Sequence, residues 1–334
     1  MMRTFRAVLA VTLLATACTA PRPRGGPQGL VVDVLVRHTP PPRQAAAGAE
    51  WVYALISLVE SDRMGMADSV HLSTQSLVRA ACLDAWLRGN GRPSPLPPRG
   101  NAAAALRLMR QYGVFTYDAY PDTLPPHLPA LLRALERAGS RAEADSLLNA
   151  AFGYLPPRVY LYGAVYTPQE LAASVLEPDT YEAFMSDTRH TFFAPIPSSG
   201  GMAESRIVTH NLPLRALVDT AVATLRRGSS LIWEGDMSEP GCRHAANGRA
   251  LWPITQRAVT AAERQHDLQG GLTTPDATMH LVGLAHDAHD QPYFILKTGG
   301  AAQAPAWGYL LMNANYLRMK TLQASYAGKP QSPP

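Results

Sequence analysis

Hydrophobic residues in the first half of the chain recur every three to four positions. This spacing predicts helices that bury one face or more. The helices expected on this pattern, together with one further along the chain, cover residues 51–64, 73–87, 102–112, 131–148 and 214–226. The first of them is apolar on most faces for two turns, so we expect it to lie at the centre of a domain.

Short apolar runs bounded by turn residues replace this spacing in much of the second half. Such runs predict strands, and one more run occurs near the start of the chain, where prolines at 40–42 end it. The strands expected on this pattern cover residues 30–36, 230–235, 279–285, 293–297 and 307–312. A helical first half and a β-rich second half predict an α+β chain with two lobes.

The composition limits the classes of protein to which the chain can belong. Its 334 residues, 46% of them hydrophobic and 17% charged, suffice for one large domain or two lobes around a shared core. Three cysteines without a Cys-x-x-Cys pair provide neither a disulfide framework nor a zinc motif. Basic residues are scattered and the net charge is only +4, which argues against nucleic-acid binding.

The amino terminus has the pattern of an export signal. Arg3 and Arg6 precede an apolar run over 7–17, which is shorter than the roughly 20 residues of a membrane-spanning helix. Small residues then lead to Cys18, as in a bacterial lipobox. We therefore expect residues 1–17 to be removed and Cys18 to carry lipid. The alternative is an ordinary secretory signal with an incidental cysteine.

Export and lipidation would determine where the protein resides. Removing Arg3 and Arg6 lowers the net charge from +4 to +2. Residues 18–29 then form a tether, and Thr19 in place of the Asp that marks inner-membrane retention favours the outer membrane. The expected location is the cell envelope, with the membrane contacted through the lipid. Export would also permit a disulfide between Cys82 and Cys242, but the sequence does not place them within bonding distance.

One string resembles the nucleophile motif of papain-like cysteine peptidases. In that motif a Gln precedes the catalytic Cys by six residues, a Gly precedes it by two, and a Trp follows it. Gln44, Gly48 and Trp51 occupy those positions, while Glu50 stands where the Cys is expected.

Further segments follow in the order of the same superfamily, in its branch related to bleomycin hydrolase and aminopeptidase C. They cover residues 72–79, 100–106, 111–114, 117–121, 166–169 and 211–214. The resemblance implies a papain-like α+β fold, with a helical lobe, an antiparallel β-barrel-like lobe and a peptide-binding cleft between them. We expect the domain to span 30–326 before a tail at 327–334. Within it we expect a helical lobe over 44–121, an insertion or bridging segment over 122–190 and a mainly β lobe over 191–326.

The resemblance also identifies the positions that carry the chemistry of the family. Its members use a Cys that a His ionises, an Asn that orients the His, and the Gln of an oxyanion hole. The triad-equivalent positions of this chain hold Glu50, Ala277 and Thr298, and Gln44 is the oxyanion equivalent. A carboxylate is a poor acyl-transfer nucleophile and an alanine transfers no proton, so we expect no covalent peptide hydrolysis by this route.

Other groups near these positions have simpler explanations. His280 is three residues from Ala277 in an expected strand, so it should face the other way and be packed or hydrogen-bonded rather than act as a base. Histidines and aspartates at 286–290 are expected to form a solvated turn rather than a metal site. Glu50 has two interpretations, a carboxylate stabilised by the helix N-terminus or a group that binds basic or amino-terminal parts of a peptide.

The sequence thus predicts a catalytically inactive, papain-like lipoprotein that uses no cofactor and no metal. Its expected partner is a peptide or a protein, bound in or near the cleft by Gln44, Gly48, Glu50 and Trp51. The alternative is a peptide hydrolase of the same family with relocated chemistry based on Glu50.

Overall fold

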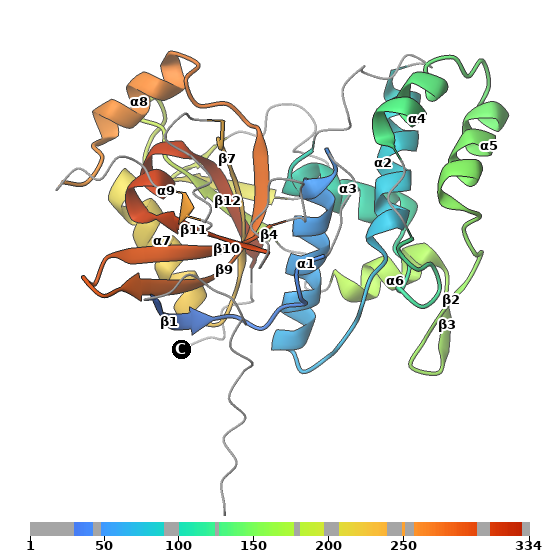
Figure 1. Cartoon of the computed structure of the whole chain (residues 1–334), viewed down its shortest axis with the longest axis horizontal. Coiled ribbons are helices and arrows are strands. Elements are labelled where there is room, and N and C mark those ends of the chain that lie inside the picture. The colour runs from blue at the N-terminus through green and yellow to red at the C-terminus, as the bar shows by residue number, and fades with distance from the viewer. Residues whose placement is uncertain are drawn as a thin grey trace, which may run out of the picture.

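The computed structural model has two lobes that meet along one central helix, α1 (Figure 1). It describes residues 30–42, 48–89, 100–123, 127–176, 181–196, 207–238, 257–298 and 308–328, and the backbone of 249–250. In Figure 1 the mainly β lobe lies on the left and the helical lobe on the right. The predicted division into a helical and a β-rich lobe is confirmed.

The helical lobe packs its helices around one hydrophobic core. Its elements are α1 (Glu50–Gly65), α2 (Thr74–Arg88), α3 (Ala102–Tyr112), α4 (Leu128–Leu135), α5 (Arg141–Phe152), α6 (Pro168–Val175) and a hairpin of β2 (Val159–Leu161) and β3 (Ala164–Tyr166). Every position of α1 from Trp51 to Ser61 except Tyr53 is buried, so the expectation of a central buried helix is confirmed. The prediction of a single helix over 131–148 is wrong, because the region forms two helices, α4 and α5. Ser140 caps the second of them by accepting a hydrogen bond from the N–H of Glu143.

The mainly β lobe is built on a ten-stranded sheet. Its strands are β1 (Leu30–Leu35), β4 (Tyr181–Met185), β5 (Pro195–Ile196), β6 (Ile207–Asn211), β7 (Leu231–Gly235), β8 (Arg249–Ala250), β9 (Ala277–Asp287), β10 (Pro292–Lys297), β11 (Tyr309–Asn313) and β12 (Thr321–Ala327). They run in the order β5-β6-β4-β12-β7-β9-β10-β11-β8, and β1 also pairs with β9. The pairs β4–β6 and β8–β11 are parallel, and the other pairs of this sheet are antiparallel.

Three of the described helices accompany this sheet. They are α7 (Leu214–Arg226), α8 (Ala261–Gln269) and α9 (Ala314–Lys320). The sequence predicted α7 with these bounds, whereas α8 and α9 were not expected. Local caps explain both: Thr260 and Glu263 form a capping box at the start of α8, and Asn313 caps α9.

The expected bridging segment, residues 122–190, has contacts with both lobes. Leu131, Leu148 and Leu171 are buried in the core of the helical lobe, together with the other apolar residues of α4, α5 and α6. The next element, β4, joins the large sheet between β6 and β12. Helices α4 to α6 therefore pack in the helical lobe, whereas β4 pairs in the large sheet.

A buried carboxyl group joins the two lobes near the start of α3. Glu234 in β7 accepts a hydrogen bond from the backbone N–H of Ala102, the first residue of α3, over 3.1 Å. A negative charge is favourable at a helix N-terminus, but burial removes the carboxylate from water. Burial dominates and raises the pKa of Glu234 from 4.5 to about 7.

We predict that Glu234→Gln changes how stability depends on pH. The folded protein holds the proton of Glu234 more tightly than the unfolded chain, so the stability of the natural protein decreases as pH rises from 4.5 through 7. The amide keeps the contact with Ala102 without titrating. The free energy of unfolding of the variant, measured by urea denaturation, should therefore gain about 3 kcal/mol on the natural protein between pH 4 and 8. Glu136→Gln, at an exposed position, is the control, and parallel pH profiles for all three proteins would contradict the assignment.

Candidate functional site

The candidate site lies where α1 begins. Gly48 has φ +87°, in the left-handed region that favours glycine, and turns the chain into the helix. Glu50 is the first residue of α1 and is half-buried. Its carboxylate makes no hydrogen bond or ion pair with another residue that the structure describes, while the helix N-terminus favours its negative charge. Gln44 lies outside the described residues.

Trp51 packs this helix end against the entry to α3. Its side chain is buried, and its ring lies so close to Gly100 that a Cβ on that residue would come within 2.7 Å of the ring. The close approach therefore requires glycine at position 100. Trp51 acts as a packing residue under the site, and it fixes where Glu50 sits relative to α3.

On the β lobe, the start of β9 lies beside the strand that contacts the start of α3. Ala277 begins β9 and pairs with Gly235. The residue before Gly235 is Glu234, whose carboxyl group contacts the start of α3. The start of β9 and the start of α1 thus flank the same short segment, residues 100–102. Ala277 is half-buried and its methyl group packs against the core of the β lobe.

Thr298, directly after β10, is hydrogen-bonded to the residue that precedes β11. Its hydroxyl donates to the carbonyl of Gly308 over 2.9 Å, and its N–H donates to the same oxygen over 3.0 Å. The side chain is buried, and Gly299 and Gly300 after it lie outside the described residues. Neither Ala277 nor Thr298 brings a titratable group to the site.

His280 lies deep in the contact between α1 and β9. It is fully buried, and its Nδ1 is 2.7 Å from the hydroxyl of Ser57, two turns along α1 from Glu50. That hydroxyl also accepts a hydrogen bond from the ammonium group of Lys297 over 2.6 Å. The other ring nitrogen, Nε2, has no hydrogen-bond partner in the described part of the chain. Burial lowers the pKa of His280 well below its usual range.

The same contact contains a separated ion pair. Lys297 also donates to the hydroxyl of Thr39 over 3.1 Å, and that hydroxyl donates to Glu60 over 2.6 Å. The backbone N–H of Leu72 holds the other oxygen of Glu60. Burial lowers the pKa of Lys297 to about 8 and raises that of Glu60. This cluster was not predicted from the sequence, although a Glu in a buried helix and a Lys at the end of a buried strand were available signals.

The thiol that the structure describes is not available for nucleophilic chemistry. Cys82 in α2 is fully buried, and burial raises the pKa of its thiol to about 12, so it stays protonated at neutral pH. Cys18 and Cys242 lie outside the described residues.

His286 and Asp287 end β9, and the polar residues that follow them turn the chain into β10, as predicted. Asp287 ends β9 and accepts hydrogen bonds from the N–H groups of His289 and Gln291, and His286 contacts Asp33 of β1 over 2.8 Å. Over the whole described part of the chain, no three His, Cys, Asp or Glu side chains lie close enough together to hold a metal ion. The described helices include none that is long and apolar enough to cross a membrane.

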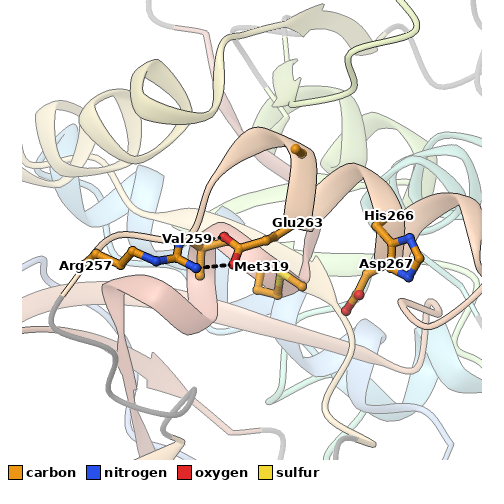
Figure 2. Close-up of a pocket in the computed structure, with 7 residues that line it drawn as sticks. Arg257, Val259, Glu263, His266, Asp267 and Met319 are labelled. Atoms are coloured by element: carbon orange, nitrogen blue, oxygen red, sulfur yellow. Dashed lines mark hydrogen bonds and ion pairs between the residues drawn. The ribbon is translucent and has the colours of Figure 1, made fainter.

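A cavity of about 410 Å³ opens on the β lobe beside α8 (Figure 2). Met319 and Val259 supply apolar surface. The ion pair of Arg257 and Glu263 lies at one end in Figure 2, and His266 and Asp267 lie at the other. Charged groups of both signs therefore line this cavity. None of the site residues predicted from the sequence is among its lining residues.

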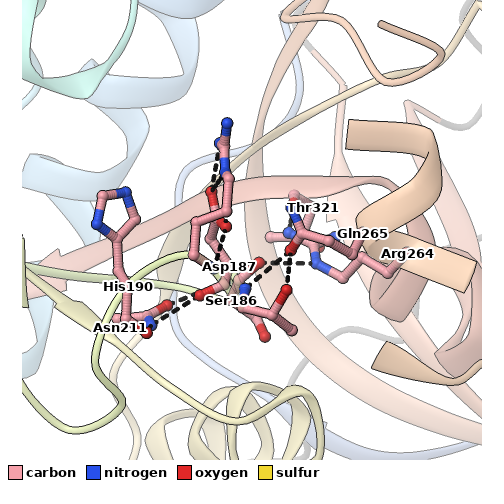
Figure 3. Close-up of polar contacts among 9 residues, drawn as sticks. Ser186, Asp187, His190, Asn211, Arg264, Gln265 and Thr321 are labelled. Carbon is pink, nitrogen blue, oxygen red and sulfur yellow. Dashed lines mark hydrogen bonds and ion pairs between the residues drawn. The ribbon is translucent and has the colours of Figure 1, made fainter. Parts of the chain in front are cut away.

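Buried polar groups hold α8 in place (Figure 3). The guanidinium of Arg264 donates to four backbone carbonyls, which belong to Ser186, Arg318, Met319 and Thr321. The next residue, Gln265, accepts from both the N–H and the hydroxyl of Thr188. These contacts bind α8 to the loop after β4 and to α9, so this side of the β lobe is fixed by long-range polar contacts.

Comparison with known proteins establishes the fold. Neither a protein-family model nor a curated protein matches the sequence. Among solved structures, the chain is similar to PepW from Lactobacillus rhamnosis HN001, with a TM-score of 0.62 and 13% identity over 89% of this chain and 82% of that one. A structure from work on the mite allergens Blo t 1 and Der p 1 matches with a TM-score of 0.46 and 13% identity, covering 96% of this chain and 75% of the other. The likeness to PepW confirms the papain-like two-lobe α+β fold predicted from the sequence.

Proposed function

We propose that this chain is a papain-like protein without cysteine-peptidase chemistry, which binds a peptide or protein partner at the start of α1. The observation that carries the proposal is the set of side chains at that place. A carboxylate, Glu50, occupies the helix end where the resemblance expects a thiolate. The two further triad-equivalent positions hold Ala277 and a Thr298 whose hydroxyl is bound to a carbonyl.

Two other groups could have replaced the missing chemistry, and their surroundings argue against it. His280 is enclosed between α1 and β9 and directs Nδ1 to Ser57, so it does not face the helix end that carries Glu50. A general base must reach the proton that it removes, within one hydrogen bond or through one water molecule. Cys82 is enclosed in the helical lobe with a raised pKa. We therefore favour binding over catalysis.

Glu50 determines the proposed class of ligand. It is half-buried, at the positive end of a helix dipole, and it has no polar partner among the described residues. A carboxylate in that setting gains most from a cationic group that enters from outside the protein. We propose that the ligand presents a basic side chain or a free amino terminus to Glu50, and that Trp51 and Gly100 keep the carboxylate in position.

We also propose that the protein is a lipoprotein of the cell envelope, attached through Cys18. The support comes from the sequence: a basic start, an apolar run too short to span a bilayer, and small residues before the cysteine. Attachment would keep the binding site close to a membrane surface.

Glu50→Cys should place a reactive thiol at the start of α1. The helix N-terminus lowers the pKa of a cysteine at this position, as it stabilises the carboxylate now. The variant should therefore be labelled by an epoxide inhibitor of cysteine peptidases, with mass spectrometry locating the label on residue 50. The natural chain and a Ser73→Cys control, at a buried helix cap, should stay unlabelled. An unreactive thiol at position 50 of a folded variant would show that this helix end is not open to ligands.

Glu50→Gln should weaken the binding of cationic peptides. The amide keeps the size of the side chain and removes its charge, so the affinity for peptides with a free amino terminus should decrease about tenfold, or ~1.4 kcal/mol. Acetylating the amino terminus of the peptide should lower the affinity of the natural chain for it and leave the affinity of the Glu50→Gln variant almost unchanged. Calorimetric titration of a peptide library provides the measurement, with Glu136→Gln as the control. Equal affinities of the natural chain and Glu50→Gln for all peptides would contradict the proposed role of Glu50.

A further inference from the structure

We propose that one end of the domain docks on the lipid bilayer that holds the anchor. This inference rests on the proposed attachment through Cys18. The surface involved, called the apolar end below, consists of exposed side chains from β1, the end of α1 and the β2–β3 hairpin. Its members are Val31, Val32, Met66, Tyr160, Tyr162 and Val165.

The β2–β3 hairpin provides the aromatic part of the apolar end. Tyr160 and Val165 are direct partners across the two strands, so their side chains lie side by side on one face. That face points to solvent, since Tyr160 is 73% exposed and Val165 is 53% exposed. Tyr162 and Gly163, with φ of +50° and +80°, form the tight turn between the strands. The hairpin thus presents apolar surface that contributes nothing to the core.

Specific contacts fix the hairpin to the end of α1. The hydroxyl of Tyr162 donates to Asp68 over 3.0 Å and also contacts the carbonyl of Ser69. These residues closely follow Met66, the C-cap of α1, whose side chain is exposed. The hairpin tip and Met66 therefore belong to one continuous surface.

The segment after β1 reaches the same end of α1 from the other side. Ser61, in the last turns of the helix, donates a hydrogen bond to the carbonyl of Arg37 over 2.5 Å. Val31 and Val32 lie six and five residues before Arg37, in β1, and both are exposed. Figure 1 shows β1, the end of α1 and the β2–β3 hairpin along the lower side of the molecule.

The position of the tether identifies a bilayer as the occupant. Residues 18–29 separate the proposed lipid from Leu30, where β1 begins. Twelve residues reach at most about 40 Å, so β1 stays close to the membrane. Tethering over such a distance gives an effective concentration of about the millimolar range, at which weak affinity suffices for docking. Tyrosine prefers the interface of a bilayer, and Val and Met gain by leaving water.

The charges near the apolar end have both signs. Arg37 and Arg158 are exposed beside it, and so is Asp33. Attraction to acidic lipids is therefore not required, and we infer docking on a zwitterionic surface through apolar contact. A helix of 16 residues is about 24 Å long, so docking at the C-terminal end of α1 directs Glu50 and the binding site away from the membrane.

The test uses the mature protein purified from membranes and reconstituted in phosphatidylcholine vesicles. Mass spectrometry first shows whether Cys18 carries lipid. Hydroxyl-radical footprinting then compares this sample with the soluble Cys18→Ala chain. We expect oxidation of Tyr160, Tyr162 and Met66 to slow at least fivefold on the vesicles. Oxidation of Leu272 should not change, because it follows α8, on the far upper side of Figure 1, and is 54% exposed, like Val165.

A double variant separates docking from mere proximity to the membrane. Tyr160→Ser with Val165→Ser removes exposed apolar groups only, so the fold should be kept, and the protection of Met66 on vesicles should be lost. Leu272→Ser is the matched control and should leave that protection intact. A lipidated protein whose Tyr160 is oxidised equally fast with and without vesicles overturns the inference. A mature chain without lipid on Cys18 also overturns it, and in that case the ligand-binding proposal remains testable by the peptide titrations.

Discussion

Burial of polar groups between α1 and the sheet is the constraint on which the structure depends. Ser57 accepts a hydrogen bond from Lys297 and is hydrogen-bonded to Nδ1 of His280, and these three side chains come from one helix and two strands that are far apart in the chain. All three are buried, so their bonds to one another replace bonds to water, while Nε2 of His280 has no partner among the described residues. An unpaired buried donor or acceptor costs about 1–3 kcal/mol, which restricts the lobes to arrangements that keep these bonds. The relative position of the two lobes, and hence the shape of the site at the start of α1, follows from this contact.

This arrangement is compatible with the proposed loss of peptidase chemistry from the fold. The residues that join the lobes lie two turns or more beyond Glu50 along α1, or in Glu234 and its contact with α3. The residues at the triad-equivalent positions make local contacts, such as that of Thr298 with Gly308. Replacing them leaves the lobe contact intact. A protein that lost peptidase activity could therefore keep a preformed site, and its use for binding is the function that we propose.

Much of the fold was predictable because burial leaves a local, periodic trace. The bounds of α3 and α7 were predicted to the residue, and β9 to β11 within a few residues, since their apolar positions repeat with helical or strand spacing. Short or polar elements leave no such trace: α8 is recognisable only by its capping box, and Ser140 divides a region whose spacing suggested one helix. A Glu in a buried helix and a Lys at the end of a buried strand indicate buried charges, but the contacts of Lys297 span more than 200 residues, so no local pattern predicts which groups meet. The resemblance in sequence identified Glu50 as a site residue. Its half-buried setting and its lack of a polar partner among the described residues are known only from the structure.

The central claim is that this papain-like protein does not cleave peptides through a thiol. Incubating the purified mature chain with a broad set of fluorogenic peptide and aminopeptidase substrates, with and without an epoxide inhibitor of cysteine peptidases, tests it most directly. We expect no turnover above that of a Glu50→Ala variant, with or without the inhibitor. Cleavage that the inhibitor abolishes would contradict the central claim.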